Sequence, residues 1–442
     1  MFDALLRWFY LLHLAFPVLL LADRAVLWSR GFRTSAHVAV LALAALWLAA
    51  GAAFYWHSRR RPERLARLSN ALLTFWTVVL VVAICEAAAQ IYVSPRIVLR
   101  KEYLYPPGAS YTYRIDPAIA PGLEGAGRFT INELGLRGPG IETSLGDRVI
   151  AVGGSTTQCL YLDDSEAWPG VLMQELKARG RSAWVAAAAV AGHTTVHHLR
   201  FLQTLPSLRE IDLLIFLAGI NDLVTTMNHE GGATEDALQE ATDRFFEGRW
   251  LRGHTLRSSG LLDRLMLYQL ARIAFEPPDP TLHIDAAGRF YMGRRDERGR
   301  SPMVPMPRLD TGLAEYRRRI AAIGEECRKR KSRCLFLTQP TIWRDDLPQE
   351  LQRMVWFGGV GEGSGRKGFT TIADLERAMA RYNAALLEVC RQQGLECFDL
   401  APAIPKDVSA FFDDCHFNEN GARLVGKVLA DYLSARPPFQ LR

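Results

Sequence analysis

Long apolar runs dominate the N-terminal part of the chain. They cover residues 8–22, 38–56 and 71–85, and the last continues with small residues to Val93. Because about 20 residues of helix cross the hydrocarbon layer of a membrane, we expect three transmembrane helices, near residues 5–25, 37–56 and 71–92. A cleaved secretory signal is the alternative for the first run, but the small-x-small cleavage pattern is poor there.

The loop between the second and third apolar runs is strongly basic. Residues 57–67 contain five Arg. Positively charged loops remain in the cytoplasm, so the part of the chain that follows the third run is expected outside it. The predicted location is therefore the inner cell membrane, as a multi-pass protein with its soluble region in the periplasm.

From residue 148 onward the pattern changes to short apolar runs separated by helical stretches. Apolar residues recur at three- and four-residue intervals in segments 167–177, 312–328 and 372–390, as in crossover helices. The short runs suit buried parallel strands: residues 149–152, 184–189, 213–217, 335–337 and 397–400. This alternation predicts an α/β fold, a three-layer α/β/α sandwich around a five-stranded parallel sheet of the flavodoxin-like type.

The remaining segments fit around this domain. Residues 1–93 form the membrane region, and residues 94–147 are a linker or a small β-layer before the domain at 148–442. Two long insertions, at about 223–310 and 342–369, each follow the carboxyl end of a strand, where ligand crevices form. They are expected to act as a lid or as specificity walls, with decoration without function as the alternative.

Charge and cysteine content exclude some classes of function. Nine Arg, no Lys and four acidic residues lie within residues 1–93, so most of the net charge of +6 belongs beside the apolar runs. No nucleic-acid partner is expected from this distribution. The seven Cys include no CxxC pair or zinc spacing, so we expect no metal and no cofactor. Cys327/Cys334 and Cys390/Cys397 each join a helix end to the next strand; we interpret them as buried free thiols, with disulfides as the alternative.

The first predicted strand leads into Gly153-Gly154-Ser155, which leaves a small hydroxyl at the strand's carboxyl end. This is a position for a nucleophile, although such a Ser is more often a helix N-cap. The GxSxG pattern is absent because Thr157 replaces its second glycine, and no Lys follows at phosphate-loop spacing.

Two later strand ends carry candidate hydrogen-bond donors. Asn221 follows Gly219 after the third predicted strand, and its amide can donate to charge that develops on an acyl oxygen; a simple cap or turn at Asn221-Asp222 is the alternative. Gly192 follows the second strand and offers a backbone N–H. The segment 132–138, with two glycines, is interpreted as a surface turn.

Near the C-terminus, Asp413 and His416 are three residues apart, just before an amphipathic helix. This spacing can place a carboxylate on one imidazole nitrogen and leave the other for a serine. A solvated loop histidine is the alternative. His193, His197 and His198 lack a nearby third metal ligand and are interpreted as surface residues at a helix start.

In order, these landmarks resemble the blocks of the SGNH/GDSL hydrolase superfamily over residues 148–435. The resemblance implies Ser155 as nucleophile, His416 as base and then acid, and Asp413 as the group that orients His416, with Asp414 as the competing acid. It also implies an oxyanion hole made by the N–H groups of Ser155 and Gly192 and the side chain of Asn221. The first block departs from Gly-Asp-Ser-Leu at two positions, and residues 187–192 lack the usual Asn-x-Gly.

The resemblance implies a serine esterase, and the apolar runs with the basic loop predict that it is membrane-anchored and extracytoplasmic. The expected substrate is an O-acyl ester, with O-acetyl groups of a cell-surface polysaccharide preferred because no long apolar stretch indicates an acyl-chain tunnel. The alternatives are O-acyl transfer to a surface glycan, which would require a partner membrane protein, a lipid esterase or lysophospholipase, and a non-catalytic scaffold in glycan assembly.

Overall fold

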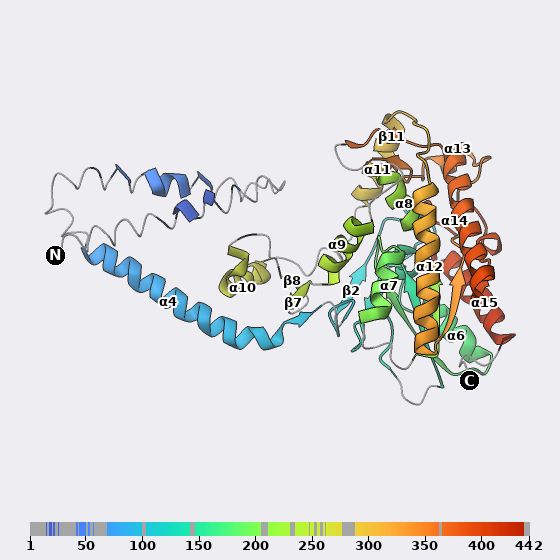
Figure 1. Cartoon of the computed structure of the whole chain (residues 1–442), viewed down its shortest axis with the longest axis horizontal. Coiled ribbons are helices and arrows are strands. Elements are labelled where there is room, and N and C mark those ends of the chain that lie inside the picture. Colours follow the sequence, from blue (N-terminus) through green and yellow to red (C-terminus); the bar gives the residue numbers. More distant parts are fainter. Residues whose placement is uncertain are drawn as a thin grey trace. The chain divides into compact units, whose positions relative to one another are not determined.

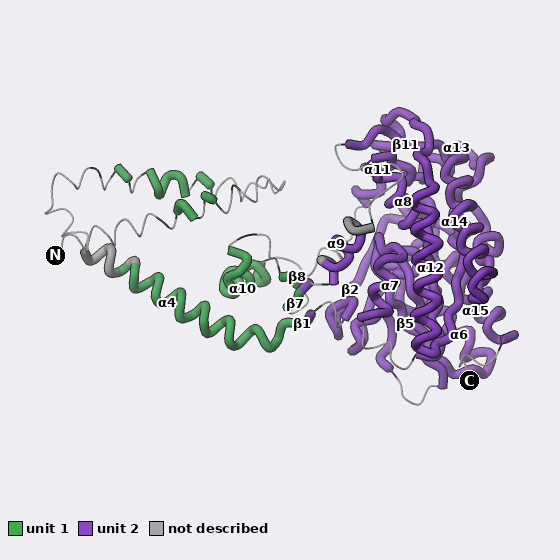
Figure 2. Tube along the Cα trace, in the orientation of Figure 1, with its two compact units in different colours: residues 1–97, 249–279 green, residues 98–248, 280–442 purple. Residues whose placement is uncertain are grey.

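The protein is described from a computed structural model. It describes residues 69–99, 103–141, 146–204, 211–229, 235–246, 248–251, 254–256, 260, 262–275, 288–361 and 365–436, with scattered positions between 15 and 56. The first predicted transmembrane helix lies largely outside the described residues, and the second is described only at separate positions between residues 41 and 56, which are helical. The chain divides into two compact units, residues 1–97 with 249–279 and residues 98–248 with 280–442, coloured separately in Figure 2.

The first unit contains a long apolar helix, α4 (Ser69–Val93), and a shorter helix, α10 (Met266–Phe275). Within the described part of the chain, one stretch, Trp76–Arg96, is long and apolar enough to cross a membrane. Glu86 of α4 accepts hydrogen bonds from the backbone N–H groups of Met266 (2.6 Å) and Leu267 (2.8 Å), which satisfies the first turn of α10. The unit also includes 3₁₀ turns at Ser94–Arg96 and Leu262–Arg264 and the antiparallel strands β7 (Arg249–Leu251) and β8 (His254–Thr255).

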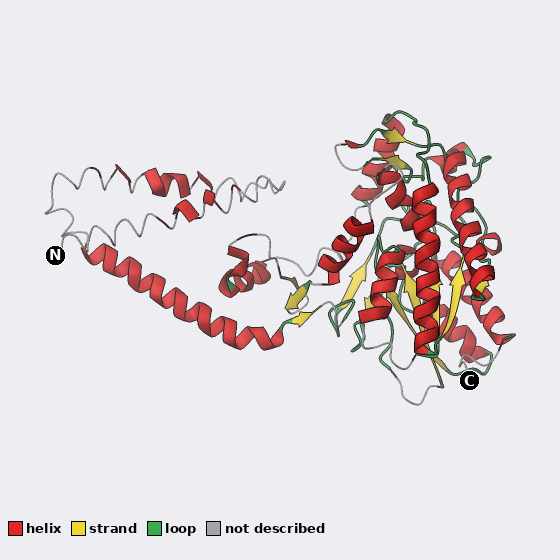
Figure 3. Cartoon of the chain, viewed as in Figure 1, coloured by secondary structure: helices red, strands yellow, loops and turns green. Residues whose placement is uncertain are grey.

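The second unit is built on the predicted five-stranded parallel sheet, drawn as yellow arrows in Figure 3. The spatial order is β12-β9-β6-β4-β5, and each neighbouring pair is parallel. Four of the strands are almost completely buried, which explains why their sequences are continuous apolar runs. The bounds are β4 (Asp147–Gly153), β5 (Ala183–Ala189), β6 (Leu213–Leu217), β9 (Arg333–Leu337) and β12 (Glu396–Phe398).

The handedness of the crossovers assigns the helices to the two faces of the sheet. The chain moves from β4 to β5 in one direction and then from β5 through β6 and β9 to β12 in the other. Right-handed connections therefore place the first crossover helix on one face and the later ones on the opposite face. The contacts agree, because α6 packs on α15, while α12 packs on both α7 and α14 (Figure 1). These helices are α6 (Trp168–Ala178), α7 (Thr195–Thr204), α12 (Asp310–Arg330), α14 (Ile372–Gln393) and α15 (Glu419–Ser434).

The segment before the sheet contains the short strand β1 (Val98–Leu99) and an antiparallel pair, β2 (Ser110–Tyr113) with β3 (Gly127–Thr130). The segment 132–138 forms a turn, but the prediction that it lies at the surface is wrong. Asn132 is buried and its side-chain oxygen accepts from the N–H groups of Leu134 and Leu136. Arg137 pairs with Ala187 of β5 and so covers the edge of the sheet.

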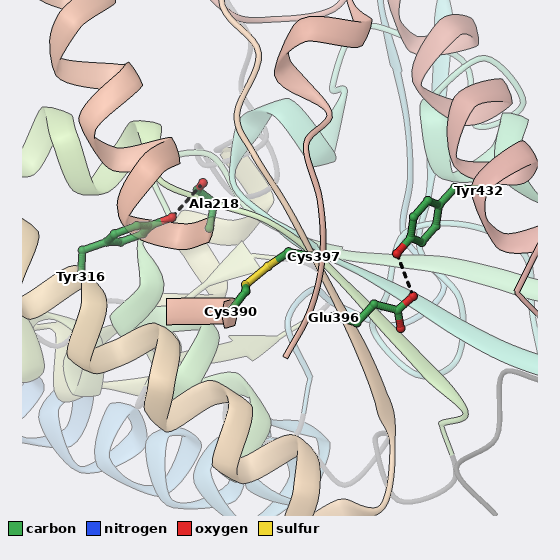
Figure 4. The surroundings of a disulfide bond; sticks show 6 residues. All are labelled: Ala218, Tyr316, Cys390, Glu396, Cys397 and Tyr432. Carbon is green, nitrogen blue, oxygen red and sulfur yellow. Dashed lines mark hydrogen bonds between the residues drawn. A yellow bond between two sulfur atoms is a disulfide. The ribbon is translucent and has the colours of Figure 1, made fainter. Parts of the chain in front are cut away.

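The structure joins Cys327 to Cys334 and Cys390 to Cys397, so the prediction of free thiols is wrong. In each pair the Cα atoms are 6.2 Å apart, within the range a disulfide can bridge. The reason lies in the topology: each helix runs back beside the strand that follows it, which brings residues seven positions apart together. Figure 4 shows the second disulfide next to Glu396, which accepts a hydrogen bond from Tyr432 (3.0 Å), and near the bond from Tyr316 to the Ala218 carbonyl (3.4 Å).

The insertions carry their own short elements in the second unit. After β6 come α8 (Ile220–Asn228), α9 (Glu235–Phe246) and α11 (Arg289–Arg300). After β9 come α13 (Gln349–Gln352) and the antiparallel pair β10 (Gly359–Val360) and β11 (Gly368–Phe369).

Candidate active site

Ser155 lies directly after β4 and begins the short helix α5 (Ser155–Gln158). The two glycines before it permit close approach of their neighbours. A Cβ at Gly154 would lie 2.3 Å from Nδ2 of Asn221, and a Cβ at Gly153 would lie 2.2 Å from Oγ1 of Thr157. The order of the strands reverses between β4 and β6, and ligands of open α/β sheets bind at such a point. Ser155 therefore lies where the topology places a ligand crevice.

His416 joins Ser155 to Asp413 in one hydrogen-bonded chain. Nε2 of His416 lies 2.7 Å from Oγ of Ser155, and Nδ1 of His416 lies 2.7 Å from Oδ2 of Asp413. Oδ1 of Asp413 also accepts from the backbone N–H of His416 at 2.9 Å, which fixes the loop. The loop ends at Asn418, whose side chain caps α15 by accepting from the N–H of Gly421. The spacing seen in the sequence thus gives the geometry of a serine–histidine–aspartate triad.

Burial and the contact between His416 and Asp413 shift the pKa values of both residues in opposite directions. Burial by itself would lower the pKa of His416, but the charge of Asp413 and its hydrogen bond outweigh that effect and raise the pKa. For Asp413, burial by itself would raise the pKa, but the charge of His416 and the bonds from His416 and Trp356 hold it below its usual value. Asp413 therefore stays ionised and favours the protonated form of His416.

Asp414 has a different set of partners. Its carboxylate accepts from Nε1 of Trp343 (2.7 Å) and from the backbone N–H of Trp356 (2.7 Å). Burial and the adjacent Asp413 raise the pKa of Asp414 to about 7. Asp414 therefore holds the segment that carries Trp356, whose own Nε1 donates to Oδ2 of Asp413 at 3.0 Å.

The residues of the three predicted oxyanion donors, Ser155, Gly192 and Asn221, line the same cavity as His416. Gly192 follows β5 in a turn closed by a bond from the His193 N–H to the Val190 carbonyl, and its φ of +81° suits the third position of a type II turn. Nδ2 of Asn221 donates to the His193 carbonyl at 2.9 Å, which fixes the amide beside Gly154. The structure thus gathers the three groups at one edge of the sheet.

A buried ion pair next to Asn221 was not predicted from the sequence. Asp222 accepts from the N–H of Thr195 (3.2 Å) and from Nη2 of Arg319 (3.3 Å), and Nε of Arg319 donates to Oγ1 of Thr195 (2.8 Å). Burial outweighs these partners and raises the pKa of Asp222. The network ties the first turn of α8 to α7 and α12 and so positions Asn221. The sequence signal is the acidic residue next to Asn221, which by itself indicates no more than a cap or turn.

The interpretation of the three histidines as surface residues is wrong for two of them. His193 and His198 are buried, and His193 stacks on His197 with ring centroids 4.4 Å apart. Burial lowers the pKa of His197 to about 4 and that of His198 to about 3, so both rings are neutral near pH 7. The edge of Phe245 meets the His193 ring at a centroid distance of 4.9 Å, and Nδ1 of His197 lies 3.1 Å from Oγ1 of Thr194.

Among the described residues, one group of possible metal ligands lies within 4.8 Å: Asp413, Cys415 and His416. Asp413 and His416 already bond to each other. Burial raises the pKa of the Cys415 thiol well above its usual value, which disfavours the thiolate that a metal needs. We therefore assign these atoms to the hydrogen-bonded chain and not to a metal centre.

The site opens into a cavity of about 650 Å³. Both insertions contribute to its wall, which favours specificity walls over decoration without function. The residues they add, which sequence reasoning missed individually, are Val224, Met227, Asn228, Phe290, Tyr291, Arg294, Trp356, Phe357, Gly358, Gly359 and Arg366. No local pattern marks them, because their common position results from the fold.

The doubly wound sheet and this site define a serine hydrolase that acts on ester bonds. Residues 151–424 match the model of the GDSL-like lipase/acylhydrolase family, and the chain belongs to that family. No curated protein matches the chain.

Solved structures match the chain at low similarity. They include an acetyl xylan esterase, AlAXEase (13% identity, TM-score 0.35, 66% of this chain and 100% of that one). An acetylxylan esterase from Geobacillus stearothermophilus is 11% identical, with a TM-score of 0.35 over 68% of this chain and 99% of its own. A lipase/acylhydrolase from Enterococcus faecalis is 13% identical, with a TM-score of 0.36 over 67% and 100%.

Proposed function

We propose that the chain is a membrane-anchored, extracytoplasmic esterase that removes O-acyl groups through an acyl-enzyme on Ser155. The observation that carries the proposal is the unbroken chain from Oγ of Ser155 through His416 to Asp413, with both heavy-atom distances at 2.7 Å. These are the distances at which a base can take the proton of a nucleophile while a third group orients it.

In the first half of the reaction, Oγ of Ser155 attacks the ester carbonyl carbon and its proton passes to Nε2 of His416. The negative charge that forms on the carbonyl oxygen is stabilised by the N–H groups of Ser155 and Gly192 and by the amide of Asn221. When the tetrahedral intermediate collapses, His416 gives its proton to the departing alkoxide. The alcohol leaves and the acyl group remains on Ser155.

In the second half, water takes the place of the alcohol. His416 accepts a proton from water as the water oxygen attacks the acyl carbonyl, and the same donors stabilise the second oxyanion. Collapse of this intermediate releases the carboxylic acid and returns the proton to Oγ of Ser155. An acceptor sugar hydroxyl in place of water would give acyl transfer.

The location outside the cytoplasm is supported by three independent features. Residues 76–96 have the length and composition of a membrane span, and residues 57–67 carry the basic charge expected on the cytoplasmic side. The two disulfides of the second unit suit an oxidising compartment.

A short acyl group on a surface glycan suits the open cavity of about 650 Å³ beside Ser155.

The test is a panel of O-acetylated sugars and lysolipids, each incubated with the full-length protein, with and without an acceptor glycan. We expect acetate release from the sugars without an acceptor, and none from Ser155→Ala. Release from lysolipids alone would contradict the glycan assignment, and product formed only with an acceptor would establish transfer instead of hydrolysis. No turnover of any ester by folded wild type would overturn the proposal.

A further inference from the structure

Two arginines line the cavity that contains Ser155 and His416. Arg294 lies on α11 in the first insertion, and Arg366 lies in the second insertion, just before β11. They share one carboxylate: Nη1 of Arg294 is 2.6 Å from Oε2 of Glu297, and Nε of Arg366 is 2.9 Å from Oε1 of the same residue. Two guanidinium groups on one carboxylate leave a net positive charge at the cavity wall.

The surrounding charges do not cancel this excess. Arg298, one turn along α11, is buried, and its hydrogen bonds to described residues go to the carbonyls of Phe357 and Thr370 and not to a carboxylate, so it adds positive charge. Burial, as the larger effect, and the positive charge of the neighbouring Arg366 lower the pKa of Arg294, as expected where positive charges lie close together. The charge of Asp414 acts on both Arg294 and Arg298, but the pKa of Asp414 is raised to about 7, so this carboxyl group is only partly ionised near neutral pH.

Aromatic rings and a glycine hold the two guanidinium groups. Cζ of Arg294 is 5.6 Å from the centroid of Phe369, and Cζ of Arg366 is at the same distance from that ring. A Cβ at residue 359 would lie 1.6 Å from Nη1 of Arg366, so a glycine at 359 leaves room for the Arg366 guanidinium group where it lies. Such packing pre-organises the planar groups, which favours bidentate binding of an anion.

Trp356 connects the arginine pair to the triad. Its ring lies 6.0 Å from Cζ of Arg294 and 6.4 Å from the ring of His416, to which it is nearly parallel. An ester positioned at Ser155 would therefore have the arginine pair one aromatic side chain away. Both arginines line the same cavity as Ser155 and His416, so one bound substrate can present its ester to Ser155 and an anionic group to the arginines.

We propose that Arg294 and Arg366 bind an anionic oxygen group of the substrate, a carboxylate or a phosphate, so that the enzyme selects acyl esters of acidic sugars. The inference rests on the proposed esterase function and adds its substrate class. Because both donors of the pair come from the insertions, selectivity for the anion is a property of the cavity wall and not of the triad.

The test compares mono-O-acetyl esters of methyl glucoside, methyl glucuronoside and methyl glucoside 6-phosphate, which share a ring and differ at C6. For the wild-type protein we expect kcat/KM of at least one charged ester to exceed that of the neutral ester by about 10-fold or more, the size of a charge-assisted contact. The two charged esters distinguish a carboxylate from a phosphate. Arg294→Gln and Arg366→Gln should bring the charged-to-neutral ratio close to one.

Arg300→Gln is the matched control, because Arg300 is on the same helix but 78% exposed and outside the cavity; it should keep the wild-type ratio. If the arginine variants do not fold, the salt dependence of wild type decides: KM should rise with ionic strength for the charged ester only. A wild-type ratio near one, an unchanged ratio in both folded variants, or equal salt dependence would overturn the inference while leaving the esterase intact. Absence of hydrolysis of all three esters, with Ser155 unreactive to a fluorophosphonate, would overturn the proposed function itself.

Discussion

At the scale of single residues, the sequence identifies the groups that are fixed by local spacing. Asp413 and His416 lie three residues apart, and the structure uses that spacing to join their side chains at 2.7 Å. Arg294, Arg366 and Asp222 could not be predicted in the same way. Their neighbours come from distant segments, so their roles depend on packing that no local pattern records.

The pH dependence of the rate follows from the His416–Asp413 pair. Because Asp413 raises the pKa of His416, the base stays protonated to a higher pH than an ordinary imidazole, and the rate should increase with pH. We expect the acidic limb of kcat/KM for a simple acetyl ester at a higher pH than the titration of an ordinary imidazole. In Asp413→Asn the residual activity should show this limb at lower pH, since the raising charge is gone. A limb that does not move would contradict the assignment of Asp413.

Substitution of the two adjacent aspartates should have different effects, on catalysis for Asp413 and on stability for Asp414. Asp413→Ala removes the group that orients His416, so kcat should fall by about 10⁴-fold with little change in KM. Asp414→Ala instead leaves the N–H groups of Trp343 and Trp356 without their acceptor, which should lower the unfolding free energy by about 2 to 4 kcal/mol. Steady-state kinetics and thermal unfolding of both variants separate the effects. A larger loss of kcat in Asp414→Ala would show that Asp413 is not the acid of the triad.

At the scale of elements, the sheet is predictable because its strands are buried on both faces and read as continuous apolar runs. Helix α11 is not, because its 12 residues include five Arg and no apolar period. It becomes ordered through tertiary contacts, such as the bonds of Arg298 to the carbonyls of Phe357 and Thr370. The disulfides were only the alternative interpretation for a similar reason, since the return path of each helix beside its strand is a property of the packed layers.

The segment around Ser155 should depend on Arg137, which is 3% exposed. Arg137 donates to the carbonyls of Gln158, Cys159 (2.8 Å) and Leu162 (2.6 Å), just after the nucleophile. Arg137→Ala should lower the unfolding free energy by about 3 kcal/mol, because several buried carbonyls lose their donor at once. It should also reduce kcat. Chemical denaturation measures the change in unfolding free energy, and steady-state kinetics measure the change in kcat. The exposed Arg114→Ala is the control, and an equal effect there would show that Arg137 has no special role.

At the scale of the whole molecule, the chain combines an apolar helix with a hydrolase domain. The second unit belongs to a family of ester hydrolases, and it carries the triad. The first unit contributes the stretch Trp76–Arg96, which has the length and apolar character of a membrane span. The membrane orientation stays a prediction from residues 57–67, because it depends on charge outside the described helices.

The role of Ser155 as the nucleophile underlies every step of the proposed reaction. It can be measured by covalent labelling of the full-length protein with a fluorophosphonate, followed by peptide mass spectrometry. We expect one adduct, on the peptide that contains Ser155, with labelling lost in Ser155→Ala and strongly slowed in His416→Ala. Folded wild-type protein that stays unlabelled, or that carries the adduct on a different serine, would contradict this role.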